Sequence, residues 1–158
     1  MYQRVVLAYD GSLEGAIALR EGALLAKHWG AQVFVLSVVP GVGGVQMAED
    51  IHAGPIAQQL DSYNALLERG LGRLRQLGLE PVGKLVVGDP VRAIGVFARG
   101  VRADLVVVGH RRQNMLERWW AGPSGSYISD HIGCTLLIAR NAISDEAFDA
   151  EVRAAGGS

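Results

Sequence analysis

The amino-acid sequence predicts one α/β domain: a doubly wound parallel sheet of five strands with helices on both faces, in a Rossmann-like or flavodoxin-like arrangement. Five short apolar runs alternate with segments whose apolar residues recur at helical spacing, and this order favours right-handed crossovers between parallel strands. Glycine accounts for 21 of the 158 residues and falls mostly where the apolar runs end, as tight turns require. The length suits one domain, and a hydrophobic content of 49% allows a sizeable core.

The predicted strands and helices follow one another in a simple order. The expected elements are a strand at 5–8, a helix from 12 to about 28, a strand at 32–39, a loop at 41–55, a helix at 56–77, a strand at 81–87, a helix that begins at 90, a strand at 105–108, a short helix that ends at 131 and a strand at 134–139. Ser12 and Asp89 are expected to cap the helices that follow them, and Pro90 suits a first helical position.

Charge, cysteine content and hydropathy exclude several classes of protein. The net charge is −1, so no basic field predicts a nucleic-acid partner. Cys134 is the single cysteine, which excludes an intrachain disulfide and predicts a small buried side chain. No apolar run reaches the length of a membrane span, so we expect no membrane association and a cytoplasmic location. Residues 142–158 hold four acidic residues and one basic residue, and we expect an acidic tail after a domain at 1–141.

Polar and small residues that follow the strands mark the edge where a ligand would bind. In an open doubly wound sheet, ligands occupy the crevice beyond the carboxyl ends of the strands. Asp10 follows the first strand and offers a carboxylate to a ribose hydroxyl or a base amino group. Residues 122–126 (GPSGS) precede a helix, and the free N–H groups of a helix start favour phosphate. Each loop equally suits a plain turn that starts a helix, so the residue pattern leaves both interpretations open.

No catalytic constellation emerges from the motifs. The sequence lacks both the Gly-Lys-Ser/Thr of a phosphate-binding loop and the His-Glu-x-x-His of a zinc hydrolase. Ser126, Asp130 and His131 do not form a triad, because successive residues of a helix point about 100° apart. The arginines within 111–118 suit a phosphate clamp or a solvated helix face. We therefore expect a binding protein more than an enzyme.

Four segments taken together resemble those of one known family. The first strand ends in Asp10-Gly11-Ser12, and the segments 33–38, 87–90 (VGDP) and 103–109 (ADLVVVG) supply later strands and turns. Over roughly residues 2–140 the chain resembles the universal stress protein family, which implies an adenine-nucleotide-binding-like α/β fold. The resemblance also implies a homodimer joined through the last strand, Thr135 to Ala139.

The nucleotide-binding branch of that family carries a spaced glycine motif, which this chain matches in part. The motif is Gly-x-x-Gly, nine residues, and then Gly followed by Ser or Thr. Aligned from Gly109, this chain has Arg112 at the second glycine, Gly122 at the third and Pro123 at the hydroxyl position. Arg112 either blocks the phosphate site or adds a charge to it, and Pro123 removes a hydroxyl and an N–H.

The resemblance implies a nucleotide site built from strand ends and two loops. The nucleotide-binding residues that it implies are Ala8, Tyr9, Asp10, Val38, Val108, Gly109, Arg112, Gly122, Ser124, Gly125 and Ser126. In this assignment Asp10 holds the ribose or the base, the Val38 backbone faces the adenine edge, and Arg112 contacts phosphate. The two serines would partly replace the hydroxyl that Pro123 lacks.

We expect a dimeric stress-response module that binds ATP, together with Mg²⁺, or AMP, and that acts on a protein partner which the sequence does not identify. Two alternatives stay open. One is a dimeric interaction protein that binds no nucleotide, which Arg112 and Pro123 favour. The other is a weak ATPase, which needs a metal ion and a water-orienting group that the sequence does not nominate.

Overall fold

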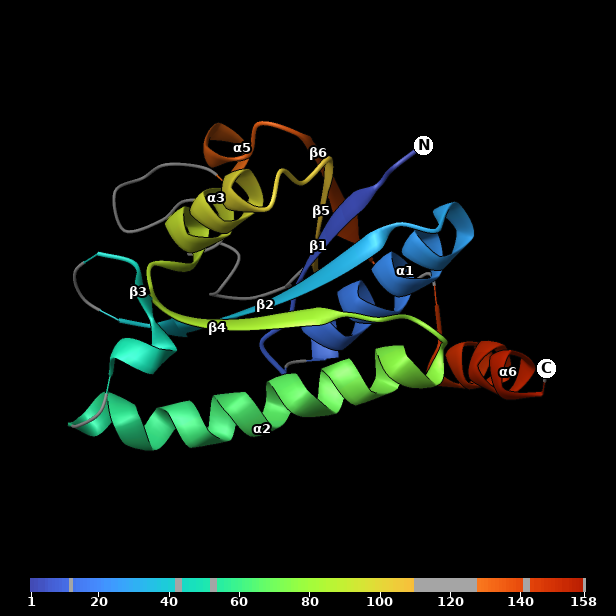
Figure 1. Ribbon diagram of the computed structural model, residues 1–158, viewed down its shortest axis with the longest axis horizontal. Helices are drawn as coiled ribbons and strands as arrows, with labels where there is room; N and C mark the ends of the chain where they lie inside the picture. The colour runs from blue at the N-terminus through green and yellow to red at the C-terminus, as the bar shows by residue number, and fades with distance from the viewer. Residues whose placement is uncertain (12, 42–43, 52–53, 110–127, 141–142, 158) are drawn as a thin grey trace.

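The strands of the computed structural model lie in one sheet (Figure 1), and five of them occupy the predicted positions. They are β1 (Arg4–Ala8), β2 (Gln32–Pro40), β3 (Gln46–Met47), β4 (Val82–Gly88), β5 (Leu105–Gly109) and β6 (Thr135–Ala139). The sheet order is β3-β4-β2-β1-β5-β6, and every neighbouring pair is parallel except β3 and β4. The structure describes residues 1–11, 13–41, 44–51, 54–109, 128–140 and 143–157. The predicted α/β fold is therefore confirmed.

The short strand β3 is an addition to the five predicted strands. Its two residues pair antiparallel with Val87 and Val86 of β4, and the chain then continues into the short helix η1 (Ala48–Asp50). Because two residues are too few to show a strand period, the sequence of the loop 41–55 gives no signal for β3.

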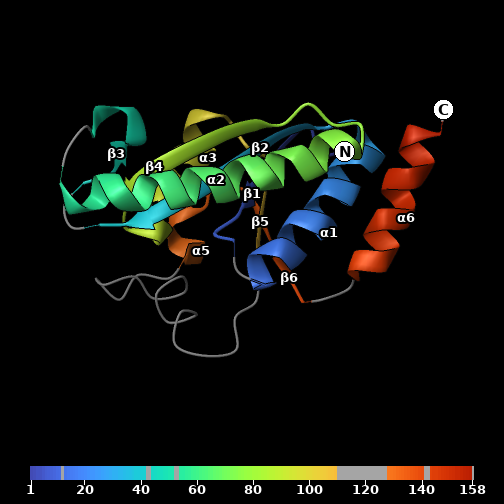
Figure 2. The ribbon, with the colours of Figure 1, turned by 90° about the horizontal axis from the view of Figure 1, so that it is seen from below.

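Helices cover both faces of the sheet, as a parallel sheet requires. The α-helices among the described residues are α1 (Leu13–Trp29), α2 (Pro55–Gln76), α3 (Pro90–Gly100), α5 (Ile128–His131) and α6 (Asp145–Gly156). Helices α1 and α2 pack on one face, while α3 and α5 lie on the other (Figures 1 and 2). None of these helices is long and apolar enough to cross a membrane.

Strand β1 shows why the apolar runs are unbroken. Val5 and Leu7 belong to the core layer under α1 and α2, whereas Val6 and Ala8 belong to the layer under α3. All four side chains are buried. Each strand of this kind contributes to two cores, so alternation of apolar and polar residues is not expected.

The helix that follows β4 begins as the sequence predicts. The Asp89 carboxylate accepts a hydrogen bond from the Arg92 N–H at 3.1 Å, and Pro90 occupies the first turn of α3. This cap satisfies one of the free N–H groups at the helix start. The other predicted cap, Ser12, lies outside the described residues.

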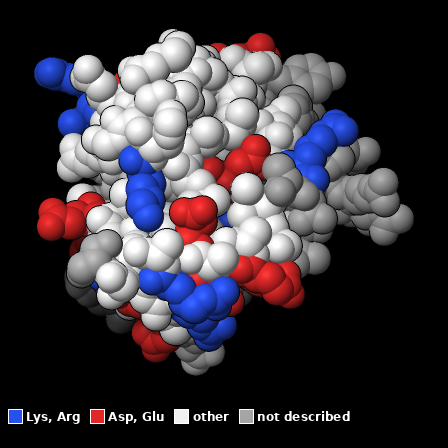
Figure 3. Space-filling view, turned by 90° about the vertical axis from the view of Figure 1, so that its right-hand side faces the viewer, with Lys and Arg blue, Asp and Glu red and all other residues white. Residues whose placement is uncertain are grey.

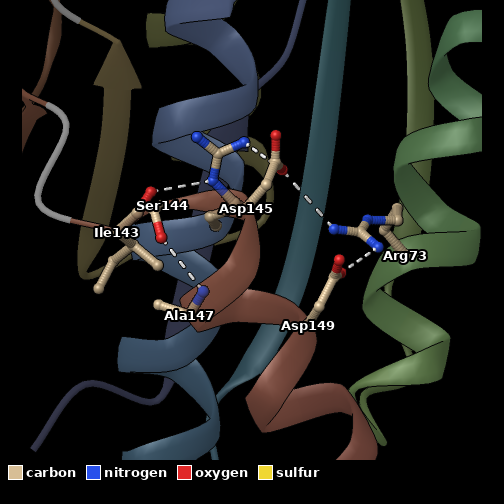
Figure 4. Close-up of polar contacts among 7 residues, drawn as sticks. Arg73, Ile143, Ser144, Asp145, Ala147 and Asp149 are labelled. Atoms are coloured by element: carbon tan, nitrogen blue, oxygen red, sulfur yellow. Dashed lines mark hydrogen bonds and ion pairs between the residues drawn. The ribbon is translucent and has the colours of Figure 1, made fainter.

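The acidic segment at the end of the chain forms helix α6, which packs beside α1 and α2. The Ser144 hydroxyl caps it by accepting from the Ala147 N–H at 3.2 Å (Figure 4). Phe148 is only 1% exposed and lies in the same core layer as the buried residues of α1 and α2. The division into a domain at 1–141 and a tail at 142–158 stays a prediction from the sequence.

Ionic contacts accompany the packing of α6. The Arg73 guanidinium of α2 donates to the Asp149 carboxylate at 2.8 Å (Figure 4) and lies 5.0 Å above the centre of the Phe148 ring. Arg20 of α1, whose side chain is 9% exposed, donates to the Asp145 carboxylate at 2.9 Å. Figure 3 shows basic and acidic side chains interspersed on the side of the molecule that carries α6 in Figure 1.

Candidate functional site

The order of the strands places a switch point between the carboxyl ends of β1 and β5, where a crevice is expected in this class of sheet. From β1 the chain moves through β2 to β4 on one side, and then returns across the sheet to β5 on the other side of β1. The outward crossovers use α1 and α2, while the return uses α3 on the opposite face. The loops after β1 and β5 therefore diverge, and such a switch point is where ligands bind in this class of sheet.

Three of the predicted site residues lie on one face near this edge. Ala8, Val38 and Val108 all belong to the core layer under α3, with exposed fractions of 3%, 5% and 3%. The register supports their proximity, because Leu7 pairs with Val107 in β5. Since these short side chains are buried, they form an apolar floor, and the polar groups they offer to a ligand are those of the backbone.

Tyr9 points its side chain to the opposite face. The Tyr9 ring lies in the core layer under α1 and α2, where a Cβ built on Gly70 of α2 would be 2.8 Å from the Tyr9 Cε1. Burial raises the pKa of the Tyr9 phenol; Arg69 opposes this rise, and Asp10 adds to it. Tyr9 therefore anchors the end of β1 to α2, and its side chain does not face the apolar floor of the crevice.

The backbone of Tyr9 is fixed by its neighbour β2. The Tyr9 N–H donates to the Leu36 carbonyl oxygen at 2.9 Å, and the Tyr9 carbonyl oxygen accepts a hydrogen bond from the buried hydroxyl of Ser37. Ser37 is a residue that our sequence reasoning missed. Its signal was available, because it is the one polar side chain inside the apolar run 33–39.

Asp10 lies directly beyond this anchor and is half-buried. Gly11 follows it with φ +78°, a conformation that favours glycine. A Cβ at Gly11 would also lie 2.7 Å from the Leu66 Cδ1 of α2. The turn after β1 is therefore held against α2, and this holds the Asp10 backbone beside the switch point.

The ends of β2 and β4 are joined to each other beside this site. Pro40 pairs with Gly88, and the Gly41 N–H donates to the Gly88 carbonyl oxygen at 3.3 Å. Gly109, at the end of β5, is half-buried and pairs with Ala139 of β6. The strand ends thus form one continuous edge, with β1 and β5 at its switch point.

The structure brings together part of the predicted site. Ala8, Asp10, Val38, Val108 and Gly109 lie on this edge, whereas the Tyr9 side chain is buried on the other face. The predicted phosphate-side residues, namely Arg112, Gly122, Ser124, Gly125 and Ser126, lie outside the described residues. Cys134 is half-buried against the α3 layer, and burial, with Asp104, raises the pKa of its thiol.

Fold and strand order together define an α/β protein with a switch point at the carboxyl ends of a doubly wound sheet. The model of the universal stress protein family matches residues 1–140. The chain therefore belongs to the universal stress protein family.

Relatives of known family match along most of the chain. A universal stress protein of Synechocystis is 24% identical over 153 residues, which cover 89% of this chain and 99% of the relative. One from Methanocaldococcus jannaschii is 22% identical over 148 residues, covering 89% of this chain and 83% of the relative.

Solved structures share the fold. A universal stress protein in complex with cAMP has a TM-score of 0.65 and 25% identity, with 87% of this chain and 96% of that chain covered. The Archaeoglobus fulgidus protein in complex with dAMP has a TM-score of 0.64, 22% identity, and 87% and 97% coverage. An Arabidopsis thaliana family member with AMP bound has a TM-score of 0.61, 20% identity, and 92% and 98% coverage.

Proposed function

We propose that this chain is a stress-response module that binds an adenine nucleotide, ATP or AMP, in the crevice beyond β1 and β5. The observation that carries the proposal is the switch point, where Asp10 follows β1 and Gly109 ends β5, the two strands at which the strand order reverses. Family membership supports the choice of ligand, because a 25% identical universal stress protein with this fold is solved with cAMP. The dAMP and AMP complexes of other family members agree with that choice.

Each part of the nucleotide has a proposed contact. The Asp10 carboxylate accepts hydrogen bonds from the ribose hydroxyls or the base amino group, and the Val38 backbone faces the adenine edge. The apolar floor of short side chains suits a planar base, since ligand sites combine apolar walls with a few polar groups. Arg112 contacts phosphate, as guanidinium groups commonly do.

Mg²⁺ would accompany ATP through the phosphates of the nucleotide. In the part of the chain that the structure describes, no group of three or more His, Cys, Asp or Glu side chains is placed to hold a metal ion. We therefore assign no protein ligand to the ion, and AMP is the simpler probe of the site.

The test measures bound nucleotide and affinity on the full chain. Mass spectrometry of the denatured protein identifies any copurified nucleotide, and calorimetry then measures the affinity for AMP and for ATP with Mg²⁺. We expect the Asp10→Ala variant to bind AMP at least about tenfold more weakly, which corresponds to about 1.4 kcal/mol. The matched control is Glu80→Ala, which removes an exposed carboxylate just before β4. It lies at the amino ends of the strands, whereas the proposed site lies at their carboxyl ends.

Four outcomes separate the alternatives. A protein that is purified empty and binds none of ATP, ADP or AMP contradicts the proposal and favours an interaction protein. Phosphate release from ATP that the Asp10→Ala change abolishes supports a weak ATPase. An Arg112→Ala variant that loses affinity for AMP but not for adenosine supports the phosphate contact, whereas a gain in ATP affinity shows that Arg112 blocks the site.

We also propose that two copies associate through β6. This strand pairs with β5 on one side, and no other strand among the described residues pairs with it. Its central residues Leu136, Leu137 and Ile138 are only half-buried. An apolar strand edge of this kind needs cover, and a second copy of the same strand provides it.

A further inference from the structure

A cavity lies at the other side of the sheet from β6, between α2, η1 and β4. Its volume is about 510 Å³, which is in the range of ligand-binding pockets. Leu60, Leu67 and Leu71 of α2 and Leu85 of β4 are buried residues that line it. Figure 1 shows η1 and the first turns of α2 on the same side of β4. This cavity is separate from the proposed nucleotide site, whose apolar residues lie in the layer under α3.

The strand beside this cavity is open along half of its length. β4 pairs with β2 from Val82 to Gly88, but β3 pairs with it only at Val86 and Val87. On the side away from β2, no strand among the described residues pairs with 82–85. In a parallel strand, alternate residues direct their N–H and C=O groups to either side, so this edge presents unpaired backbone groups.

The open edge begins at an exposed residue. Val82 is 42% exposed, which is unusual for a large apolar residue in this protein. A Cβ on Gly83 would lie 2.6 Å from the Leu71 Cδ1, so this glycine lets α2 pack closely on β4. Another backbone can therefore reach the edge beside Val82, while Leu71 fills the space above Gly83.

The rim of the cavity is acidic. Glu49, Asp61 and Glu68 line it, and among the described residues Lys84 is the one basic residue that does. The Lys84 ammonium lies 3.9 Å from the Glu49 carboxylate, and the Arg75 guanidinium lies 3.8 Å from the Glu68 carboxylate. No ion pair is formed by Asp61 among the described residues. The rim therefore has a net negative charge and favours a cationic group over the apolar floor.

We propose that an extended peptide segment of a partner protein adds to β4 at residues 82–85 and places an apolar and a basic side chain into this cavity. Strand addition gives affinity through backbone hydrogen bonds and specificity through pockets for alternate side chains. Residues two apart on the peptide point to the same face. One of them packs on the leucine floor, and the next, a lysine or arginine, pairs with Asp61, in the negative field that Glu68 adds to. A small cationic ligand would fill the cavity but leave the strand edge unpaired.

The proposal is tested by selection from a displayed library of random seven-residue peptides on the full chain. We expect enriched peptides in which an apolar residue and a Lys or Arg are two positions apart. In fluorescence anisotropy, their affinity should fall at least tenfold for the Asp61→Lys, Glu68→Lys double variant. The matched control is Glu80→Lys, an exposed charge reversal that does not line the cavity. Absence of enrichment, or equal affinity for all three proteins, would overturn the proposal.

Backbone methylation distinguishes strand addition from filling of the cavity alone. Methylation of alternate peptide nitrogens blocks the N–H groups that face β4 in one set and those that face solvent in the other. We expect one set to abolish binding and the other to leave it unchanged. If both methylated peptides bind as well as the parent, the peptide does not add as a strand and the proposal fails.

Discussion

At the residue scale, the contact between Tyr9 and Gly70 links the nucleotide crevice to helix α2. Gly70 is buried, and the Tyr9 ring occupies the space where any larger residue would place its Cβ. The Tyr9 backbone cannot move away easily, because Leu36 and Ser37 hold its N–H and its carbonyl oxygen. A glycine that costs about 1 kcal/mol of helix stability is thus explained by the ring it accommodates.

Two glycine substitutions in α2 test this explanation against each other. Gly72→Ala should raise the free energy of unfolding by about 1 kcal/mol, because its Cβ meets nothing within 4 Å and helix propensity improves. Gly70→Ala should instead lower stability relative to Gly72→Ala by about 1–3 kcal/mol through overpacking against Tyr9. Urea unfolding measures both values. Equal stabilisation by the two changes would show that the Tyr9 ring moves aside without loss of stability.

Glu21 of α1 gives a pH-dependent prediction. Its Oε2 is buried and has no hydrogen-bond partner among the described residues, and burial raises the pKa of its carboxyl group. Because the pKa in the folded state lies above that in the unfolded state, the ionised carboxylate destabilises the fold at neutral pH. This cost declines as the pH falls through the folded-state pKa, since the folded protein then binds the proton more tightly.

We therefore expect Glu21→Gln to raise the free energy of unfolding at pH 7, by up to about 1 kcal/mol. The gain should shrink as the pH is lowered toward the pKa of the unfolded carboxyl group. Thermal or urea unfolding at several pH values measures it. A gain that is the same at pH 4 and pH 7 would assign the effect to packing rather than to charge.

Single residues of the site were predictable where their role depends on chain order alone. Asp10 and Gly109 follow apolar runs, and Asp89 precedes a proline at a helix start, so their places at strand and helix ends could be inferred. The direction of the Tyr9 side chain could not be inferred. Side chains alternate along a strand, but which of them face α2 and which face α3 depends on the neighbouring strands and their register.

At the element scale, helix α6 depends on one aromatic anchor more than on the ion pair between Arg73 and Asp149. Phe148 is fully buried, whereas the Arg73 and Asp149 side chains that pair beside it are 36% and 44% exposed. Exposed ion pairs contribute about 0–1 kcal/mol, while loss of a buried phenyl ring costs about 3–5 kcal/mol. The helix is therefore attached to the core chiefly by apolar packing.

The change Phe148→Ala should lower the free energy of unfolding by about 3–5 kcal/mol, and Asp149→Asn by no more than about 1 kcal/mol. Urea unfolding measures both, and amide hydrogen exchange in residues 145–156 reports whether α6 stays folded. A Phe148→Ala variant as stable as the parent chain would show that the segment behaves as a tail without a stabilising contact.

The elements that the sequence predicted are those with a long pattern. The five parallel strands and the helices α2 and α3 were predictable, because burial on both faces or a helical stripe extends over many residues. β3 has two residues and shows no pattern. In α6 the apolar positions Phe148 and Val152 are separated by acidic residues, so composition indicated a tail although the two share one helix face.

At the scale of the whole molecule, the two edges of the sheet differ in what they present. On the β4 side, β3 covers Val86 and Val87, and the acidic rim of the cavity lies beside the open part of the strand. On the other side, β6 presents half-buried apolar residues and no charged side chain. Like charges disfavour pairing of two acidic edges, whereas two apolar edges gain by mutual burial. This asymmetry predicts that self-association uses β6 and leaves the β4 edge free for another partner.

Sedimentation of the full chain tests this asymmetry. We expect a mass near twice 16.8 kDa and a shift toward the monomer when Ile138 is changed to Lys, because the change would bury an unpaired charge between two apolar strands. The matched control is Val82→Lys on the exposed part of β4, which should leave the dimer intact. Thermal unfolding of both variants verifies that each is folded. A chain that is monomeric before any change, or a dimer dissociated by Val82→Lys and not by Ile138→Lys, would contradict association through β6.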